Sequence, residues 1–80
     1  MKYEIELNSI EKVKHFSDKI QKIQCNAIIR SKDKHYIVDA KSIMGIFGFD
    51  LTKKLILEME NYEEDFIKEL KLYGIRLQEI

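Results

Sequence analysis

The sequence predicts an α+β protein, an open-faced β-sandwich in which helices cover one face of a four-stranded, mostly antiparallel sheet. Two observations carry this prediction: apolar residues recur at a period of two in some segments, and at a period of three to four in others. The expected order is strand, helix, strand, strand, helix, strand, helix. With 80 residues, 45% of them hydrophobic and 35% charged, the chain has room for one domain, over residues 1–80.

The first strand and the first helix follow from a change of period near residue 10. Apolar and charged residues alternate from Lys2 to Leu7, which predicts a strand with one buried face. We expect Asn8 to cap the following helix, with Glu11 completing a capping box. The apolar stripe that packs this helix on the sheet is predicted to hold Ile10, Val13, Phe16, Ile20 and Ile23.

A hairpin and a further strand are predicted in the middle of the chain. The β-prone runs 27–29 and 36–38 are separated by a polar segment, so we expect two strands joined by a polar tip. After a short helical turn, apolar residues at a spacing of two predict another strand, beginning near Leu51 and containing Leu55, Leu57 and Met59.

The last predicted element is a helix that Asn61 is expected to cap. Its first turn holds three acidic residues, which the helix dipole favours at this end. Gly74 is expected to end the helix, and the state of residues 75–80 is left open. The buried stripe is predicted to consist of Phe66, Ile67, Leu70 and Tyr73.

Charge and cysteine content exclude several classes of protein. Fourteen basic and fourteen acidic residues give a formal net charge of zero, which argues against a dedicated nucleic-acid binder. No apolar run reaches transmembrane length, so no membrane partner is expected. The single cysteine, Cys25, permits no intrachain disulfide and favours a cytoplasmic location. Two histidines and one cysteine match none of the usual zinc spacings, and neither a metal nor a cofactor is expected.

The most informative segment for function is KSIMGIFGFDL, residues 41–51. Ser42 precedes an apolar run and is expected to cap a short helix, where free backbone amides would favour a phosphate on its hydroxyl. The alternative is an ordinary capping serine. A one-sheet domain covers one side of such a helix, so we expect Ile43, Ile46 and Phe49 to point inward. Met44 and Phe47 would then form, beside Ser42, a contact surface for a protein partner, and the residues expected to bind it are Lys41, Ile43, Met44 and Phe47. The alternative is that all five apolar residues of the segment belong to the core.

The segment from Lys41 to Ile46 resembles the regulatory-serine segment of HPr, the small phosphocarrier of the bacterial phosphoenolpyruvate:sugar phosphotransferase system. The predicted order of elements is also similar to the HPr fold, over roughly residues 2 to 74. The resemblance implies that Ser42 is phosphorylated by an HPr kinase/phosphorylase. It also implies that the product binds a sugar-responsive transcription regulator in carbon catabolite repression.

The sequence departs from HPr at the phosphocarrier site. Members of that family carry a histidine followed by Ala-Arg-Pro at the start of the first helix, whereas residues 8–13 here read NSIEKV. The sequence therefore resembles the catabolite-repression variants of HPr, which lack the carrier histidine and keep the serine. We expect a non-catalytic, regulatory protein.

Two other functions stay open at the level of sequence. The first is an HPr-fold interaction module in which Ser42 is a structural cap only. The second is a phosphocarrier that uses His15, about two turns into the predicted helix. His35 is expected to face solvent, Cys25 to be buried, and the acidic residues between 58 and 65 to be a solvated surface. The identity of the regulator, the sugar system and the oligomeric state do not follow from the sequence.

Overall fold

The computed structural model describes all residues from 1 to 80. The chain forms five strands and three helices, and the first seven elements follow the predicted order. The elements are β1 (Lys2–Ile5), α1 (Ile10–Ile20), β2 (Ala27–Arg30), β3 (Ile37–Asp39), α2 (Ile43–Ile46), β4 (Leu55–Met59), α3 (Glu64–Leu72) and β5 (Leu77–Glu79).

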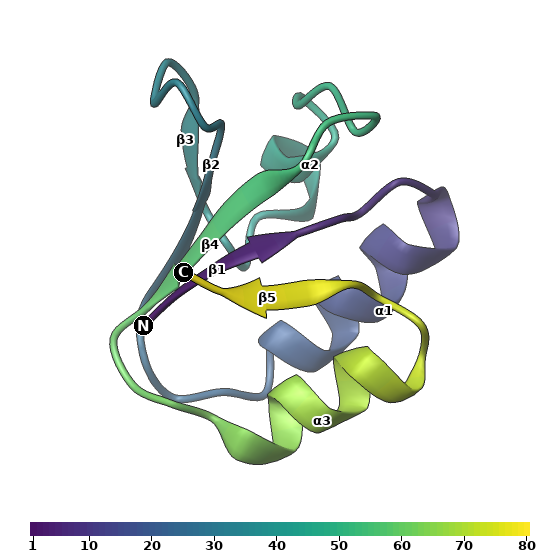
Figure 1. The fold of residues 1–80 in the computed structure, drawn as a ribbon, viewed down its shortest axis with the longest axis vertical. Helices are drawn as coiled ribbons and strands as arrows, with labels where there is room; N and C mark the ends of the chain where they lie inside the picture. Colours follow the sequence, from purple (N-terminus) through teal and green to yellow (C-terminus); the bar gives the residue numbers. More distant parts are fainter.

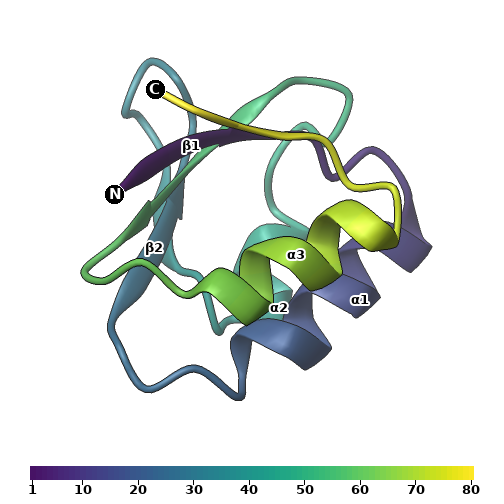
Figure 2. The same ribbon diagram turned by 60° about the horizontal axis from the view of Figure 1, so that its bottom comes forward.

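The strands form one sheet in the order β3-β2-β4-β1-β5, and every neighbouring pair is antiparallel. The helices lie together on one side of this sheet, with α1 and α3 side by side (Figures 1 and 2). The α+β class and the open antiparallel sheet are therefore confirmed. None of the helices combines the length and the apolar character needed to cross a membrane.

The prediction of a four-stranded sheet is wrong, because the segment after Gly74 adds a fifth strand. Gly74 ends α3 as predicted, at a φ of 94° that favours glycine. The chain then turns back, and β5 pairs with β1 so that Leu77 lies opposite Ile5 and Glu79 opposite Tyr3. The partner strand lies more than seventy positions earlier in the chain, so local pattern alone did not reveal this pairing.

The core lies between the sheet and the helices and contains most of the predicted apolar faces. Ile10 is an exception, being 58% exposed, because it is the first residue of α1. Tyr73 is 45% exposed, because it lies just after α3 and caps its end. The largest fully buried side chains are Phe16, Ile5, Leu7, Ile20, Ile29, Ile46, Leu57, Leu70, Ile75 and Val13.

Both predicted caps of the long helices are wrong. Ser9 caps α1, its Oγ accepting the N–H of Lys12 at 3.2 Å. Asn8 accepts instead from the Lys12 ammonium at 2.9 Å, and Glu11 lies one position too early for a capping box with Ser9. Helix α3 begins after Glu63, which makes no side-chain cap. In both cases a residue nearer the helix takes the capping position.

Charged side chains cover the face of the sheet opposite the helices. Arg30 on β2 forms an ion pair with Glu58 on β4, and Ile56 beside them is only 5% exposed. The hydrogen bond from Arg30 holds the pKa of Glu58 below its ordinary value. On the neighbouring strand, Glu4 pairs with two lysines, Lys32 at 2.7 Å and Lys54 at 3.4 Å. The charged side chains on this face therefore form ion pairs across the strands.

Candidate functional site

The segment singled out by the sequence forms the connection between β3 and β4. Ser42 caps α2 as predicted: its Oγ accepts the N–H of Gly45 at 3.2 Å. Its own N–H donates to the carbonyl of Asp39 at 2.9 Å, so the backbone passes from β3 into α2 through a tight turn. Ser42 is exposed. Its hydroxyl is therefore both a structural cap and open to solvent.

Gly45 allows α2 to lie against β3. A Cβ at this position would lie 3.0 Å from Ser42 Oγ and 3.0 Å from Val38 Cβ. At these distances the neighbouring side chains would have to shift. The glycine thus places the Ser42 cap directly on the edge strand of the sheet.

Tyr36 fastens the end of α2 to the hairpin, a role that the sequence did not indicate. Its hydroxyl donates to the carbonyl of Gly45 at 3.3 Å, and its ring packs edge-on against Phe49 with centroids 4.6 Å apart. A Cβ on Gly48 would lie only 2.5 Å from the Tyr36 hydroxyl. The β-prone character of residues 36–38 indicated a strand here, and no local signal pointed to this contact across nine positions.

The apolar residues of this segment divide between core and surface as predicted. Ile46 is fully buried, Phe49 is 8% exposed, and Ile43 packs partly buried against the core. Met44 is 80% exposed and Phe47 is 41% exposed. Exposed apolar side chains therefore lie on the same short element as the exposed Ser42 hydroxyl. We call Ser42, Met44 and Phe47 the α2 surface.

Lys41 does not extend along the α2 surface. Its ammonium donates to the carbonyl of Ile23 at 2.9 Å, just after α1. Its backbone carbonyl accepts from the side chain of Gln21 at 2.7 Å, and its N–H donates to the Asp39 carboxylate at 2.9 Å. Lys41 thus ties the start of α2 to the end of α1.

The two histidines lie far from any arrangement typical of a phosphocarrier. His15 is the sixth residue of α1, and its ring stacks on Tyr73 at a centroid distance of 3.8 Å. Its Nε2 is buried without a hydrogen-bond partner. His35 is at the hairpin tip, 88% exposed as predicted, with Nδ1 3.5 Å from the Asp33 carboxylate. Neither ring lies at the start of a helix.

The remaining candidates are the thiol of Cys25 and the acidic side chains. Cys25 is a buried free thiol, as predicted. No three histidine, cysteine or acidic side chains are placed to hold a metal ion. Asp50, just after the α2 surface, accepts from the hydroxyl and N–H of Thr52, and these hydrogen bonds lower its pKa.

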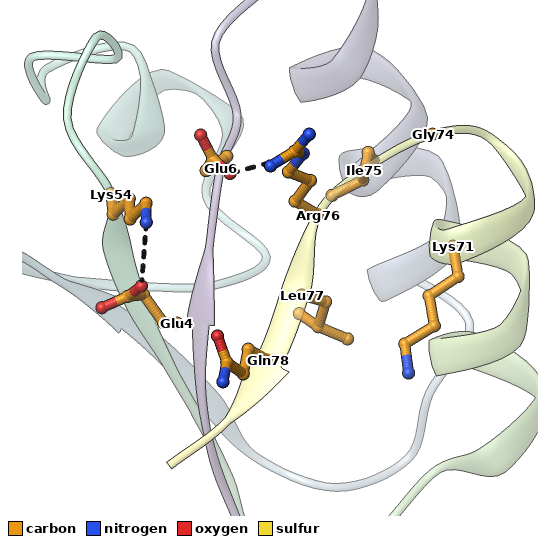
Figure 3. A pocket seen from close by; sticks show the side chains of 9 residues that line it. All are labelled: Glu4, Glu6, Lys54, Lys71, Gly74, Ile75, Arg76, Leu77 and Gln78. Carbon is orange, nitrogen blue, oxygen red and sulfur yellow. Dashed lines mark ion pairs between the residues drawn. The ribbon is translucent and has the colours of Figure 1, made fainter.

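Ser42 lines none of the surface pockets. One of about 380 Å³ lies between the hairpin tip and Phe49, with Tyr36 and Gly48 in its wall. The largest, about 520 Å³, lies on β5 at the opposite edge of the sheet (Figure 3). None of the residues of the α2 surface lines a pocket. Comparisons of the chain with protein-family models, with curated proteins and with solved structures gave no match.

Proposed function

We propose that this chain is a non-catalytic regulatory domain that binds a protein partner through the α2 surface, and that phosphorylation of Ser42 controls the binding. The observation that carries the proposal is that one short segment, from the N-cap to the C-cap of α2, exposes both the Ser42 residue and the apolar side chains of Met44 and Phe47. Methionine and aromatic side chains adapt well to protein partners. The likeness of residues 41–46 to the regulatory segment of HPr makes HPr kinase the enzyme to test.

A phosphate on Ser42 would change the surface more than the fold. It would add a charge of about −1.5 to −2 beside two apolar side chains. Lys41 would not neutralise this charge directly, since its ammonium is bound to the Ile23 carbonyl. The Asp39 carboxylate, which accepts the N–H of Lys41, the residue before Ser42, adds to the negative potential. The modified surface would suit a partner that offers an arginine next to an apolar pocket.

The surroundings of His15 support a role without phosphoryl transfer. A carrier histidine needs free helix amides and a cation to hold the phosphoryl group. At the start of α1 the hydroxyl of Ser9 occupies the amide of Lys12, and Glu11 lies in the first turn. His15 is further along the helix and stacked on Tyr73.

A second candidate is a protein-binding module in which Ser42 is never modified. The hydrogen bond from Gly45 N–H favours it, because this bond already gives the hydroxyl a structural role. In this case Met44 and Phe47 would contact the partner in the unmodified protein. The two candidates share the α2 surface and differ only in whether phosphate is needed.

Phosphorylation can be tested by incubating the protein with ATP and a bacterial HPr kinase and measuring intact mass. We expect one phosphate on the wild type and none on Ser42→Ala. Ser9→Ala is the matched control, because Ser9 is a half-buried capping serine with the same 3.2 Å bond to a backbone amide. Wild type without phosphate, or equal uptake by Ser42→Ala, would contradict regulation through Ser42.

Partner binding is tested separately, with a sugar-responsive transcription regulator of the kind that binds phosphorylated HPr. We expect the phosphorylated protein to bind, and Met44→Ser and Phe47→Ser to weaken binding. Leu72→Ser is the control, because Leu72 is 87% exposed and lies on α3. Equal binding by the unmodified protein would favour the second candidate, and equal weakening by Leu72→Ser would exclude the α2 surface from both.

A further inference from the structure

Strand β5 presents an unpaired backbone edge. The N–H of Glu6 donates to the carbonyl of Arg76, and the N–H of Ile80 donates to the carbonyl of Lys2. Hydrogen-bonded pairs alternate along an antiparallel ladder, so these two bonds place the inward-facing backbone groups of β5 at positions 76, 78 and 80. The N–H and C=O groups of Leu77 and Glu79 consequently point away from β1. No further strand follows β5 in the sheet.

The opposite edge of the sheet is less open. The outer carbonyl of Asp39 on β3 accepts the N–H of Ser42, and the Asp39 carboxylate accepts the N–H of Lys41. The turn into α2 therefore occupies the end of that edge. Because an unpaired edge is a template for another strand, β5 is the place where this sheet can be extended.

The largest hollow of the surface surrounds this edge. Its wall includes residues on both sides of β5, such as Glu4 and Gln78 on the open face and Lys71 and Leu77 on the helix side. Figure 3 shows the side chains of Lys71 and Leu77 converging on the helix side of the strand. A strand added along β5 would therefore bring its side chains next to residues on both faces of this edge.

Two charges next to this edge have no ion-pair partner within the chain, Lys71 and Glu79. The register with β1 places Glu79 on the helix side, opposite Tyr3. The pKa of Tyr3 is raised by burial and further by the charge of Glu79, in agreement with this placement. Lys71, on α3, thus shares a pocket wall with Leu77 on the helix side of β5, and Glu79 lies on that same side two residues further along the strand.

We propose that β5 pairs with β5 of a second copy of this chain, antiparallel about a two-fold axis at Gln78, to form a continuous ten-stranded sheet. In this register Leu77 lies opposite Glu79 of the second copy, and the outward backbone groups of both residues exchange hydrogen bonds. Lys71, which lies beside Leu77, then meets the Glu79 carboxylate of the second copy. The two-fold axis forms this ion pair twice, and the two Gln78 side chains lie side by side on the open face.

The dimer would carry two α2 surfaces at the far ends of the joined sheet, because α2 follows β3 and β3 is the opposite edge from β5. Bivalent partners would therefore be held more tightly than single binding sites allow. The dimer itself does not rest on the proposed function, because β5, Lys71 and Glu79 lie outside the α2 surface, whereas the tighter binding of bivalent partners does rest on it.

The dimer can be tested by sedimentation equilibrium over a series of protein concentrations, with amide exchange measured in the same samples. We expect the mass to rise from 9.6 kDa towards twice that value. The amides of Leu77 and Glu79 should become protected as concentration rises, while that of Gln78 is protected throughout. A wild type that stays monomeric, or Leu77 and Glu79 amides that exchange equally fast at every concentration, would overturn the proposal.

Charge-reversal variants distinguish the proposed β5–β5 register from nonspecific association. Lys71→Glu and Glu79→Lys should each weaken the dimer about tenfold, because each turns two attractive pairs into repulsive ones. The double variant should restore it. Lys14→Glu, an exposed lysine of α1 without an ion pair, is the matched control. An equal effect of Lys14→Glu, or a double variant as weak as the single ones, would contradict the register.

The backbone edge is tested independently by Glu79→Pro. Proline removes an outward N–H together with the Glu79 carboxylate, so Glu79→Gln, which removes the carboxylate alone, is the matched control and should dimerise more tightly than Glu79→Pro. The lost N–H has no partner within the monomer, so the monomer should fold normally, as circular dichroism will check. We expect this variant to remain at 9.6 kDa at concentrations where the wild type is dimeric. A folded Glu79→Pro that dimerises like the wild type would overturn pairing through β5.

Discussion

The imidazole of His15 stacks on the phenol ring of Tyr73, with ring centroids 3.8 Å apart and planes inclined by 8°. The contact joins the middle of α1 to the residue that caps the end of α3. On the same pair of helices, Lys19 bonds to Glu69 at 2.7 Å. The two helices are thus fastened at their surface as well as through the core.

The His15 and Tyr73 rings are predicted to be energetically coupled. A double-mutant cycle of His15→Ala and Tyr73→Ala should give a coupling free energy of about 0.5 to 1.5 kcal/mol, the usual range for aromatic pairs. Denaturant unfolding of the four proteins measures it. A cycle of His15 with the exposed Tyr62 is the control, and a coupling no larger than in that control would show that the stack contributes nothing.

His15 is predicted not to accept phosphate from the phosphotransferase system. The ring lies beyond the free amides of α1, and its Nε2 is buried. Treatment with phosphoenolpyruvate and the first phosphotransferase enzyme should leave the intact mass unchanged. An HPr that carries the active histidine serves as positive control, and acid-labile phosphate on His15 would refute the prediction.

Truncation of Phe16 or Phe66 to alanine is predicted to cost about 3 to 5 kcal/mol of unfolding free energy, because each leaves a large cavity. Phe16 is fully buried and Phe66 is 6% exposed, and their rings meet edge-on at 5.8 Å. Because the two rings touch, the double variant should cost less than the sum of the single ones. Chemical denaturation checks both points, and a loss below about 1 kcal/mol would contradict the packing.

Gly48→Ala is predicted to destabilise the protein by about 1 to 3 kcal/mol, because the new Cβ would lie 2.5 Å from the Tyr36 hydroxyl. The tyrosine would have to move and would lose its hydrogen bond to the Gly45 carbonyl. In a Tyr36→Phe background the same substitution should cost less. Thermal or denaturant unfolding of the four proteins measures the difference, and equal costs in both backgrounds would rule out this clash.

The ion pair of Glu58 with Arg30 is predicted to make stability depend on pH. Because the hydrogen bond from Arg30 lowers the pKa of Glu58 from its ordinary 4.5, the folded state is favoured above pH 4.5. This contribution is lost as the pH falls through the lowered pKa. Glu58→Gln should therefore cost about 1 kcal/mol at neutral pH and nothing once the wild-type carboxylate is protonated.

The measurement is the free energy of unfolding of wild type and Glu58→Gln from neutral pH downward. Asp18→Asn is a suitable control, because Asp18 is exposed and forms no ion pair. A difference between wild type and Glu58→Gln that stays constant across the acidic range would show that the pair does not titrate with folding.

The local pattern of the sequence was sufficient for most elements. The alternation around Tyr3 and Ile5 and the stripe through Val13, Phe16 and Ile20 correctly indicated buried faces, because periodicity reflects which side of an element meets the core. The cap at Ser42 was also predicted, since a capping hydroxyl bonds to an amide only three residues away. The division of the α2 segment into buried Ile46 and exposed Met44 followed from the geometry of a short helix on one sheet.

The tertiary structure alone decided the features that join distant residues. Strand β5 exists because residues 77–79 find a free edge on β1. The hydroxyl of Tyr36 finds the Gly45 carbonyl, and the ammonium of Lys41 finds the Ile23 carbonyl, across nine and eighteen positions. Local sequence determines which face of an element is apolar, whereas the partners of an edge, a hydroxyl or an ammonium depend on which elements the fold brings together.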